Sequence, residues 1–210
     1  MTPRPYNPHQ RQQAVDAGRE RVLGAAREVL RLDDVASFSL DAVAKRAGVT
    51  RMTLYNQFGS RAGLLGELFD TLIERDAFSK MPSVFAQKDI GAAFDAFVGI
   101  LGKFYSDNRA VMISLSGVAG TDPDLAEAMR SRHERRRIGI EGIIRKMGTK
   151  LAPSVAASEL VTTLDTLLNF ATFNAIAGPD RAPSAVVPHM RRLIRGVLGL
   201  SVAKSRTRKR

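Results

Sequence analysis

The chain has 210 residues, no cysteine and a formal net charge of +11 at pH 7. The lack of cysteine excludes disulfides and thiolate metal sites, and His9, His133 and His189 lie too far apart to suggest a metal site. No apolar run approaches the length of a membrane span and the polar first residues are unlike a signal peptide, so we expect a cytoplasmic protein without metal or cofactor.

The N-terminal part predicts a flexible arm followed by a helix. Residues 1–17 are polar and contain prolines, and Arg4 and Arg11 flank a stretch that could reach a minor groove, although an unstructured leader is the simpler alternative. From about residue 16 to residue 32, apolar side chains form one stripe: Val22, Leu23, Ala26, Val29 and Leu30. We expect this helix to brace the following segment within a first domain over residues 18–61.

Residues 39–61 predict two short helices joined by a tight turn. Ser39 is an N-cap residue type, and apolar residues follow it at helical spacing: Leu40, Val43, Ala44 and Ala47. Gly48 suits the left-handed position after a helix, and Thr50 can cap the next one. The arrangement is a helix-turn-helix by its local chemistry.

The second of these helices presents polar side chains outward. Leu54 and Phe58 stand four residues apart and can pack inward with Val49. The remaining side chains are then left largely exposed: Arg51, Thr53, Tyr55, Asn56 and Gln57.

The segment resembles the DNA-binding motif of the TetR family of transcriptional repressors. The matching residues are Leu40, Val43, Ala44, Ala47, Gly48, Val49, Thr53, Leu54, Tyr55, Phe58, Ser60 and Arg61. Two positions depart from the family: Gln57 stands where His is frequent, and Arg61 replaces a common Lys. Both side chains can still donate to phosphate, Arg in a bidentate fork.

The resemblance places Arg51, Met52 and Thr53 where family members meet base edges, and Tyr55, Asn56, Gln57 and Arg61 at phosphate-contact positions. By its chemistry Arg51 could pair with guanine O6 and N7, while Met52 or the Thr53 methyl could touch a thymine methyl. The hydroxyls of Ser39 and Thr50 would add backbone contacts that fix register without reading sequence. The alternative is that Tyr55 is a half-buried packing residue and Arg51 a solvated charge.

A connecting helix is predicted over residues 60–80, and the Met81-Pro82-Ser83 stretch marks the domain boundary. Further helices are expected along the 94–104 stripe, over the short 111–115 segment, and across 122–147, 154–177 and 187–202. Asp122 before Pro123 is a clear helix start. The fold class is therefore all-α, with an N-terminal three-helix helix-turn-helix domain and a C-terminal helical domain over residues 83–203, which the family resemblance implies is a ligand-binding and dimerisation domain.

The last two predicted helices have broad apolar faces, and the family resemblance places a homodimer interface on them. A two-fold dimer would also read two half-sites of a palindromic operator. Packing within one chain is the alternative. The candidate interface residues are Leu160, Leu164, Leu167, Leu168, Leu193, Ile194, Val197 and Leu198.

Aromatic and flexible apolar residues of the C-terminal region are of the kind that line small-molecule cavities, although any one of them can simply be core. By resemblance, an effector of unknown identity would bind there and release the DNA. The candidates are Phe94, Phe97, Phe104, Tyr105, Met112, Met129, Phe170 and Phe173, with His133, Asp165, Asn169 and Asn174 as polar anchors.

The positive charge lies mainly outside the helix-turn-helix. Residues 1–80 hold twelve Lys and Arg against ten Asp and Glu, a net of +2, whereas residues 141–210 hold twelve against four, a net of +8. The tail over residues 204–210 has five of these charges and predicts a disordered end, either solubilising or binding DNA nonspecifically.

No segment assembles a catalytic set, so we expect no enzyme. The family resemblance implies a ligand-released repressor, with activation instead of repression as an open alternative. An architectural DNA-binding protein without an effector is the alternative, and the tail and the overall charge are its main supports. The expected partners are double-stranded DNA, a second copy of the chain and a small molecule.

Overall fold

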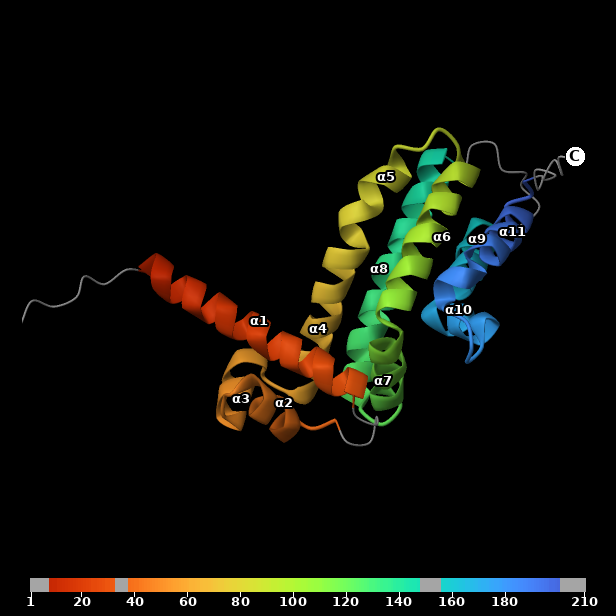
Figure 1. Ribbon diagram of the computed structural model, residues 1–210. Coiled ribbons are helices and arrows are strands. Elements are labelled where there is room, and N and C mark those ends of the chain that lie inside the picture. The colour runs from red at the N-terminus through yellow and green to blue at the C-terminus, as the bar shows by residue number, and fades with distance from the viewer. Residues whose placement is uncertain (1–7, 33–37, 148–155, 201–210) are drawn as a thin grey trace, which may run out of the picture. The chain divides into compact units, whose positions relative to one another are not determined.

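The structure is a computed structural model that describes residues 8–32, 38–147 and 156–200. These residues form helices joined by short turns, as the sequence predicts (Figure 1). Arg4, the 204–210 tail and the end of the last predicted helix lie outside the described residues. The chain divides into two compact units, one of residues 1–71 and 110–129 and the other of residues 72–109 and 130–210.

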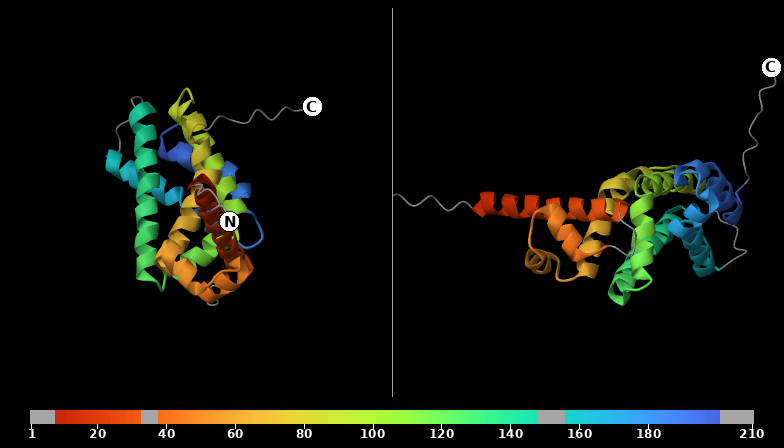
Figure 2. Two further views of the ribbon diagram at one scale, coloured as in Figure 1. Left: turned by 90° about the vertical axis from the view of Figure 1, so that its left-hand side faces the viewer. Right: turned by 60° about the horizontal axis from the view of Figure 1, so that its bottom comes forward.

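The first unit is built on α1 (Pro8–Leu32). This helix begins well before residue 16, where the apolar stripe predicts its start. Residues 12–17 are exposed and form no buried apolar stripe, so apolar periodicity does not reveal the first turns of the helix. Its C-terminal half packs against α2 (Leu40–Ala47), while its N-terminal half extends past α2 and α3 (Arg51–Phe58) in Figures 1 and 2. The long α1 thus supports both short helices.

The core of the first unit joins four helices and the start of a fifth. Buried residues come from α1, α2, α3, α4 (Arg61–Asp76) and α7 (Arg109–Ala119), among them Val22, Val43, Leu54, Leu64, Leu65, Val111 and Leu115. The Ser114 hydroxyl of α7 donates to the Leu30 carbonyl at the end of α1, with 2.9 Å between the oxygens. A buried polar group is therefore satisfied where α7 meets α1.

The boundary predicted at Met81-Pro82-Ser83 is itself helical. After α4 come the 3-10 helix η2 (Phe78–Lys80) and α5 (Met81–Phe85), and Pro82 lies in the first turn of α5. Proline is tolerated there because the first turn has no intrahelical partner for its missing N–H.

The second unit centres on α6 (Ile90–Asp107), whose N-cap Asp89 accepts from the Ala92 N–H at 2.8 Å. Around α6 pack α5, α10 (Phe170–Ala177), the 3-10 helix η4 (Pro183–Val186) and α11 (Val187–Val197). At Gly102 of α6 an added Cβ would lie 2.3 Å from the Val187 side chain, so this glycine permits the close approach of α11.

The remaining helices are α8 (Pro123–Met147) and α9 (Ala157–Leu167), and α9 is shorter than the helix that the sequence predicts. The helix α8 starts as predicted, with the Asp122 carboxylate accepting from Leu125 N–H at 3.1 Å. The single helix predicted over 154–177 is wrong: α9 ends before α10 begins. The break occurs because Asn169 adopts an extended backbone and its side chain caps α10 through the Thr172 N–H, at 2.7 Å.

Candidate nucleic-acid interface

The turn between α2 and α3 has the caps that the sequence predicts. Ser39 accepts from the Ala42 N–H at 3.1 Å, and Thr50 accepts from the Thr53 N–H at 3.2 Å. Between the two helices Gly48 has a φ of 66°, in the left-handed region that glycine adopts without strain. The orientation of α3 relative to α2 is therefore fixed by short-range hydrogen bonds and one glycine.

The recognition helix α3 buries one side and exposes the other. Leu54 and Phe58 are buried, whereas Met52 is 67% exposed and Tyr55 is 40% exposed. Arg51 and Asn56 are also exposed, and Thr53 is partly so. The three residues predicted to read bases thus all reach solvent on a surface supported by a packed core.

Arg51 has two partners before any DNA is present. Its Nη1 lies 3.0 Å from the Asp41 Oδ2 of α2, and its Nη2 donates to the Tyr55 hydroxyl at 3.3 Å. The Arg51 guanidinium also lies over the Tyr55 ring, 5.6 Å from its centroid. The hydrogen bond to Tyr55, and then the charge of Asp41, raise the pKa of Arg51, so its positive charge is secure at neutral pH.

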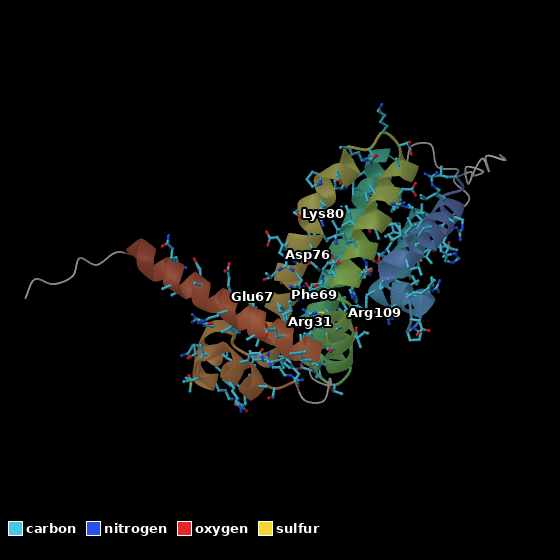
Figure 3. The ribbon with its side chains drawn as sticks, viewed as in Figure 1. Arg31, Glu67, Phe69, Asp76, Lys80 and Arg109 are labelled. Carbon is cyan, nitrogen blue, oxygen red and sulfur yellow. The ribbon has the colours of Figure 1, made fainter. Side chains whose placement is uncertain are left out.

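Arg19 of α1 ties the recognition helix to its supports. Its guanidinium pairs with the Glu67 carboxylate of α4 through two nitrogens and lies 4.7 Å from the centroid of the Phe58 ring. Glu67 is labelled in Figure 3 on α4, beside α1. A third bond runs from Arg19 Nη1 to the Gln57 carbonyl of α3, at 3.0 Å. One side chain therefore connects three helices.

The residues predicted to contact phosphate differ in their exposure to solvent and in their hydrogen-bond partners. Asn56 is exposed, Gln57 and Arg61 are half-buried, and the Arg61 guanidinium lies 5.3 Å from the centroid of the Phe38 ring. Within the described part of the chain, neither Gln57 Oε1 nor Arg61 Nε has a hydrogen-bond partner, although these two atoms themselves are buried. The hydroxyls of Ser39 and Thr50 act as caps but can still donate their own proton.

Local sequence patterns did not identify Asp41 and Arg19 as part of this interface. Asp41 contacts Arg51 from ten residues away, and Arg19 contacts Gln57 and Glu67 from 38 and 48 residues away. The exposed carboxylate in the first turn of α2, next to a predicted base-reading helix, was the one signal available for Asp41.

The predicted ligand residues are divided between the two units. Met112 and Met129 belong to the first unit, and the others belong to the second. Phe94, Phe97, Phe104, Tyr105 and Phe173 are buried, and Phe170 is half-buried. Tyr105 is central, since its ring lies 5.5 Å from that of Phe104, 5.5 Å from that of Phe170 and 5.2 Å from that of Phe173.

A polar cluster lies beside these aromatic rings. Arg136 of α8 donates from Nε to Asp165 of α9 at 2.7 Å, and the buried Tyr105 hydroxyl donates to the Leu168 carbonyl at 2.8 Å. Burial raises the pKa of Tyr105, and the charge of Arg136 opposes this rise in part. Burial alone would lower the pKa of Arg136, but Tyr105 and Asp165 outweigh it and raise that pKa.

The other predicted polar anchors have structural partners or lie at the surface. Asn169 caps α10, and Asn174 accepts from Arg109 Nε at 2.8 Å. Arg109, labelled in Figure 3, donates further to the carbonyls of Gly178 and Arg181. His133 is exposed.

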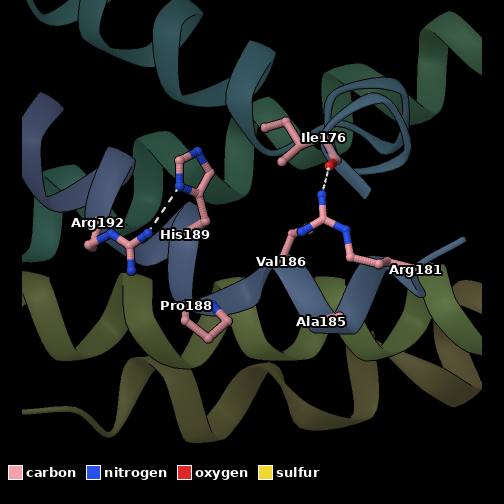
Figure 4. A pocket seen from close by; sticks show the side chains of 7 residues that line it. All are labelled: Ile176, Arg181, Ala185, Val186, Pro188, His189 and Arg192. Carbon is pink, nitrogen blue, oxygen red and sulfur yellow. Dashed lines mark hydrogen bonds between the residues drawn. The ribbon is translucent and has the colours of Figure 1, made fainter. Parts of the chain in front are cut away.

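A pocket of about 440 Å³ opens between the end of α10 and the start of α11 (Figure 4). Its lining contains Ile176, Arg181, Ala185, Val186, Pro188, His189 and Arg192, which are distinct from the predicted ligand residues. Arg181 donates to the Ile176 carbonyl at 2.6 Å, and Arg192 lies 3.2 Å from the His189 ring nitrogen. The positive side chains of this pocket are thus engaged by its own walls.

The predicted dimer residues fall into two groups. Leu164, Leu168, Ile194 and Leu198 are buried within one chain. The others reach the surface, Leu160, Leu167 and Leu193 in part and Val197 with 37% of its surface exposed.

Neither a metal centre nor a single membrane-spanning helix is evident in residues 8–32, 38–147 and 156–200. No group of three or more His, Asp and Glu side chains in these ranges could hold a metal ion. Taken one at a time, the helices there are too short or too polar to cross a membrane. Only α9 and α10 taken together are long and apolar enough, and this pair is bent by 49°.

Two capped helices around a left-handed glycine, with an exposed polar recognition helix in a helical chain, define a helix-turn-helix DNA-binding protein. Residues 22–68 match the family described as bacterial regulatory proteins, tetR family. The chain belongs to the TetR family of transcriptional regulators, which confirms the resemblance, the all-α fold and the expectation that it is no enzyme.

Individual relatives support this assignment. The chain is 31% identical over 148 residues to the HTH-type transcriptional regulator AlkX of Mycobacterium tuberculosis, an alignment that covers 69% of this chain and 65% of that protein. It is 28% identical over 195 residues to the regulator EthR of Mycolicibacterium smegmatis, covering 86% and 87% of the two chains. A crystal structure of a transcriptional regulator from Rhodococcus sp. Rha1 superimposes with a TM-score of 0.67 at 23% identity, over 86% of this chain and 95% of that one.

Proposed function

We propose that this protein is a homodimeric repressor that binds a palindromic operator through α3. We further propose that binding of a small apolar or amphipathic ligand releases the repressor from DNA. The observation that carries the proposal is the outer side of α3, where Arg51, Met52 and Thr53 project from a helix that caps and Arg19 hold in place. Rigid support of the contacting side chains is what base reading requires.

The division of labour on DNA follows from the chemistry of the side chains. Arg51 reads a guanine, and Met52 and Thr53 offer apolar contact to thymine methyl groups. Contacts to phosphate come from the hydroxyl, amide and guanidinium groups of Ser39, Thr50, Tyr55, Asn56, Gln57 and Arg61. The half-buried Arg61 would use the outer edge of its guanidinium, because Phe38 covers one face.

The dimer contact is formed by the outer surfaces of α9, α10 and α11. Leu160, Leu167, Leu193 and Val197 supply apolar area there, while the exposed Ala171 and Ala175 on α10 allow close approach. A twofold dimer places two α3 helices on one operator, and this doubles the few base contacts that one small domain offers.

The ligand site of the proposal lies in the second unit, around the rings of Phe104, Tyr105, Phe170 and Phe173. These rings offer apolar contact, and the adjacent Arg136–Asp165 pair offers polar anchors, a combination suited to an amphipathic molecule. Release from DNA requires that the ligand bind the free protein better than the operator complex.

Selection from random duplexes with the full chain tests the DNA part of the proposal. A repressor yields a palindrome that it prefers by about 10³-fold or more over unrelated DNA. Binding of all duplexes within a few-fold of the best one would instead identify an architectural protein.

Sedimentation tests the dimer, with V197R as the disrupting variant. The matched control is I138R, since Ile138 is another exposed apolar residue, on α8. A dimer that V197R dissociates and I138R leaves intact supports the proposed surface, whereas a wild-type monomer at micromolar concentration contradicts it.

The ligand part is tested by screening small amphipathic compounds for thermal stabilisation of the full chain and then for displacement of labelled operator. Compounds that stabilise the protein but bind equally well with and without operator would contradict a ligand-released repressor.

A further inference from the structure

We propose that Asp41 is a positioning residue for DNA recognition, whose carboxylate holds the Arg51 guanidinium ready for a guanine and keeps it from binding phosphates indiscriminately. The inference rests on the proposed function, because it concerns how Arg51 reads a base. It assigns a role in specificity to a residue of α2, outside the recognition helix.

Asp41 and Tyr55 hold the Arg51 guanidinium from two directions. The Asp41 carboxylate lies across the helix-turn-helix on α2 and accepts from Nη1, while Tyr55 lies one turn further along α3 and accepts from Nη2. The Tyr55 ring supports the guanidinium face. A long side chain that would otherwise sample many rotamers is thus restricted to one region of the α3 surface.

The pairing leaves enough donors for a base. A guanidinium carries five N–H groups, and the two partners each need one of them. Guanine presents O6 and N7 in the major groove and takes two donors. Arg51 can therefore keep Asp41 and Tyr55 while it binds a guanine, and it does so without first having to order its side chain.

Stabilisation of the fold does not account for this contact. The side chains of Arg51 and Asp41 are 54% and 67% exposed, and ion pairs that are so exposed contribute little to stability. The ion pair instead affects DNA binding. An unpaired Arg51 would strengthen binding to any duplex by reaching a phosphate. A paired Arg51 is neutralised in part, so it adds most to the affinity where a guanine is present.

A second role for Asp41 has to be separated from this one. An acidic residue in the first turn of a helix interacts favourably with the helix dipole, so Asp41 could act only on the stability of α2. That role would change the unfolding midpoint and would leave discrimination between bases unaltered.

The experiment uses the full chain as wild type, D41N, R51A, the D41N/R51A double variant and E28Q. Glu28 is the matched control, because it is also an exposed carboxylate of the first unit but pairs at 2.8 Å with Arg46 of α2 and not with a residue of α3. Affinities are measured by fluorescence anisotropy on the selected operator, on operators with each G·C pair replaced in turn, and on an unrelated duplex at several salt concentrations.

We expect R51A to lose about tenfold or more of the discrimination at one G·C pair. D41N should lose several-fold of the discrimination at the same G·C pair only. It should also bind the unrelated duplex more tightly, with an affinity whose salt dependence is steeper by about one phosphate contact per chain. In the R51A background D41N should have no further effect on discrimination, and E28Q should behave as wild type at that pair.

The outcomes separate the inference from the proposed function. Full discrimination in D41N, together with its loss in R51A, would overturn the role of Asp41 and leave DNA reading by Arg51 intact. If R51A retains discrimination at every pair, the reading role of Arg51 fails and the inference fails with it. Equal losses in D41N and E28Q would show a general charge effect and would also overturn the inference.

Discussion

Arg19 of α1 donates from Nη1 to the backbone carbonyl of Gln57, near the end of the recognition helix, at 3.0 Å. Gln57 is the penultimate residue of α3, where carbonyls lack intrahelical partners. The positive end of Arg19 therefore lies at the negative end of the α3 dipole while its other nitrogens pair with Glu67. The position of α3 depends on a residue about 30 positions before it.

Replacement of Arg19 by Ala is expected to lower the free energy of unfolding by about 1–3 kcal/mol, since it removes charge-assisted hydrogen bonds and leaves Glu67 without this partner. R19K should recover only part of the loss, because an ammonium cannot reproduce the bidentate fork. Urea unfolding followed by circular dichroism measures both effects.

The matched control for Arg19 is R46A. Arg46 pairs with Glu28 in the same unit, but both side chains are well exposed, so a loss of at most about 1 kcal/mol is expected. Equal losses for R19A and R46A would contradict the structural role assigned to Arg19.

A pair of glycine variants tests the turn between α2 and α3. G48A should destabilise the fold by about 1–2 kcal/mol, because Gly48 has a φ of 66° and a Cβ is strained there. G24A should stabilise it by about 0.5–1 kcal/mol, since Gly24 lies within α1 and an added Cβ meets nothing within 4 Å. Thermal unfolding midpoints that move in the same direction for both variants would contradict this account.

The helix-turn-helix was predictable because its determinants are local. Ser39, Gly48 and Thr50 specify caps and a turn within a dozen residues, and in the structure α2 lies between Ser39 and Gly48 while α3 begins directly after Thr50. The break at Asn169 was missed because apolar residues keep helical spacing on both sides of it, at Leu164, Leu168 and Ala171. Periodicity detects a buried face but does not detect a cap that interrupts it.

Contacts between distant residues could not be predicted in the same way. The pairs Arg19–Glu67 and Arg51–Asp41 depend on how helices pack, which the spacing of apolar residues does not specify. Similarly, the apolar faces of α9 and α11 were evident, but the sequence did not show that Leu164 and Ile194 would be covered by their own chain. Which side of an apolar helix stays exposed is a property of the folded unit.

Tyr105 makes a prediction about alkaline pH. Burial raises its pKa above the ordinary value of 10, so the folded state retains the phenol proton more strongly than the unfolded state does. This stability is fully present below pH 10 and is lost as pH rises from 10 through the higher folded pKa. We expect tyrosinate absorbance to show a step that occurs at higher pH in the folded protein than in urea.

The control compares Y105F with Y55F. The chain has three tyrosines and no tryptophan, so each variant removes an identifiable part of the absorbance change. Y105F should remove the delayed step and weaken the alkaline loss of stability, whereas Y55F should leave both. A delayed step that persists in Y105F would show that Tyr105 is not its source.

The Arg136–Asp165 ion pair is expected to contribute to the free energy of unfolding. Their side chains are only 15% and 24% exposed, and Asp165 accepts from Arg136 at 2.7 Å. D165A should therefore cost about 2–4 kcal/mol, because it leaves a largely buried guanidinium without its carboxylate. The double variant R136M/D165L should be more stable than D165A, since apolar side chains remove the uncompensated charge. Urea unfolding of wild type, R136M, D165L and R136M/D165L completes the cycle, with D165A as the truncation variant. Additive losses would mean that the two residues act independently, and the ion pair between α8 and α9 would then contribute nothing specific to the second unit.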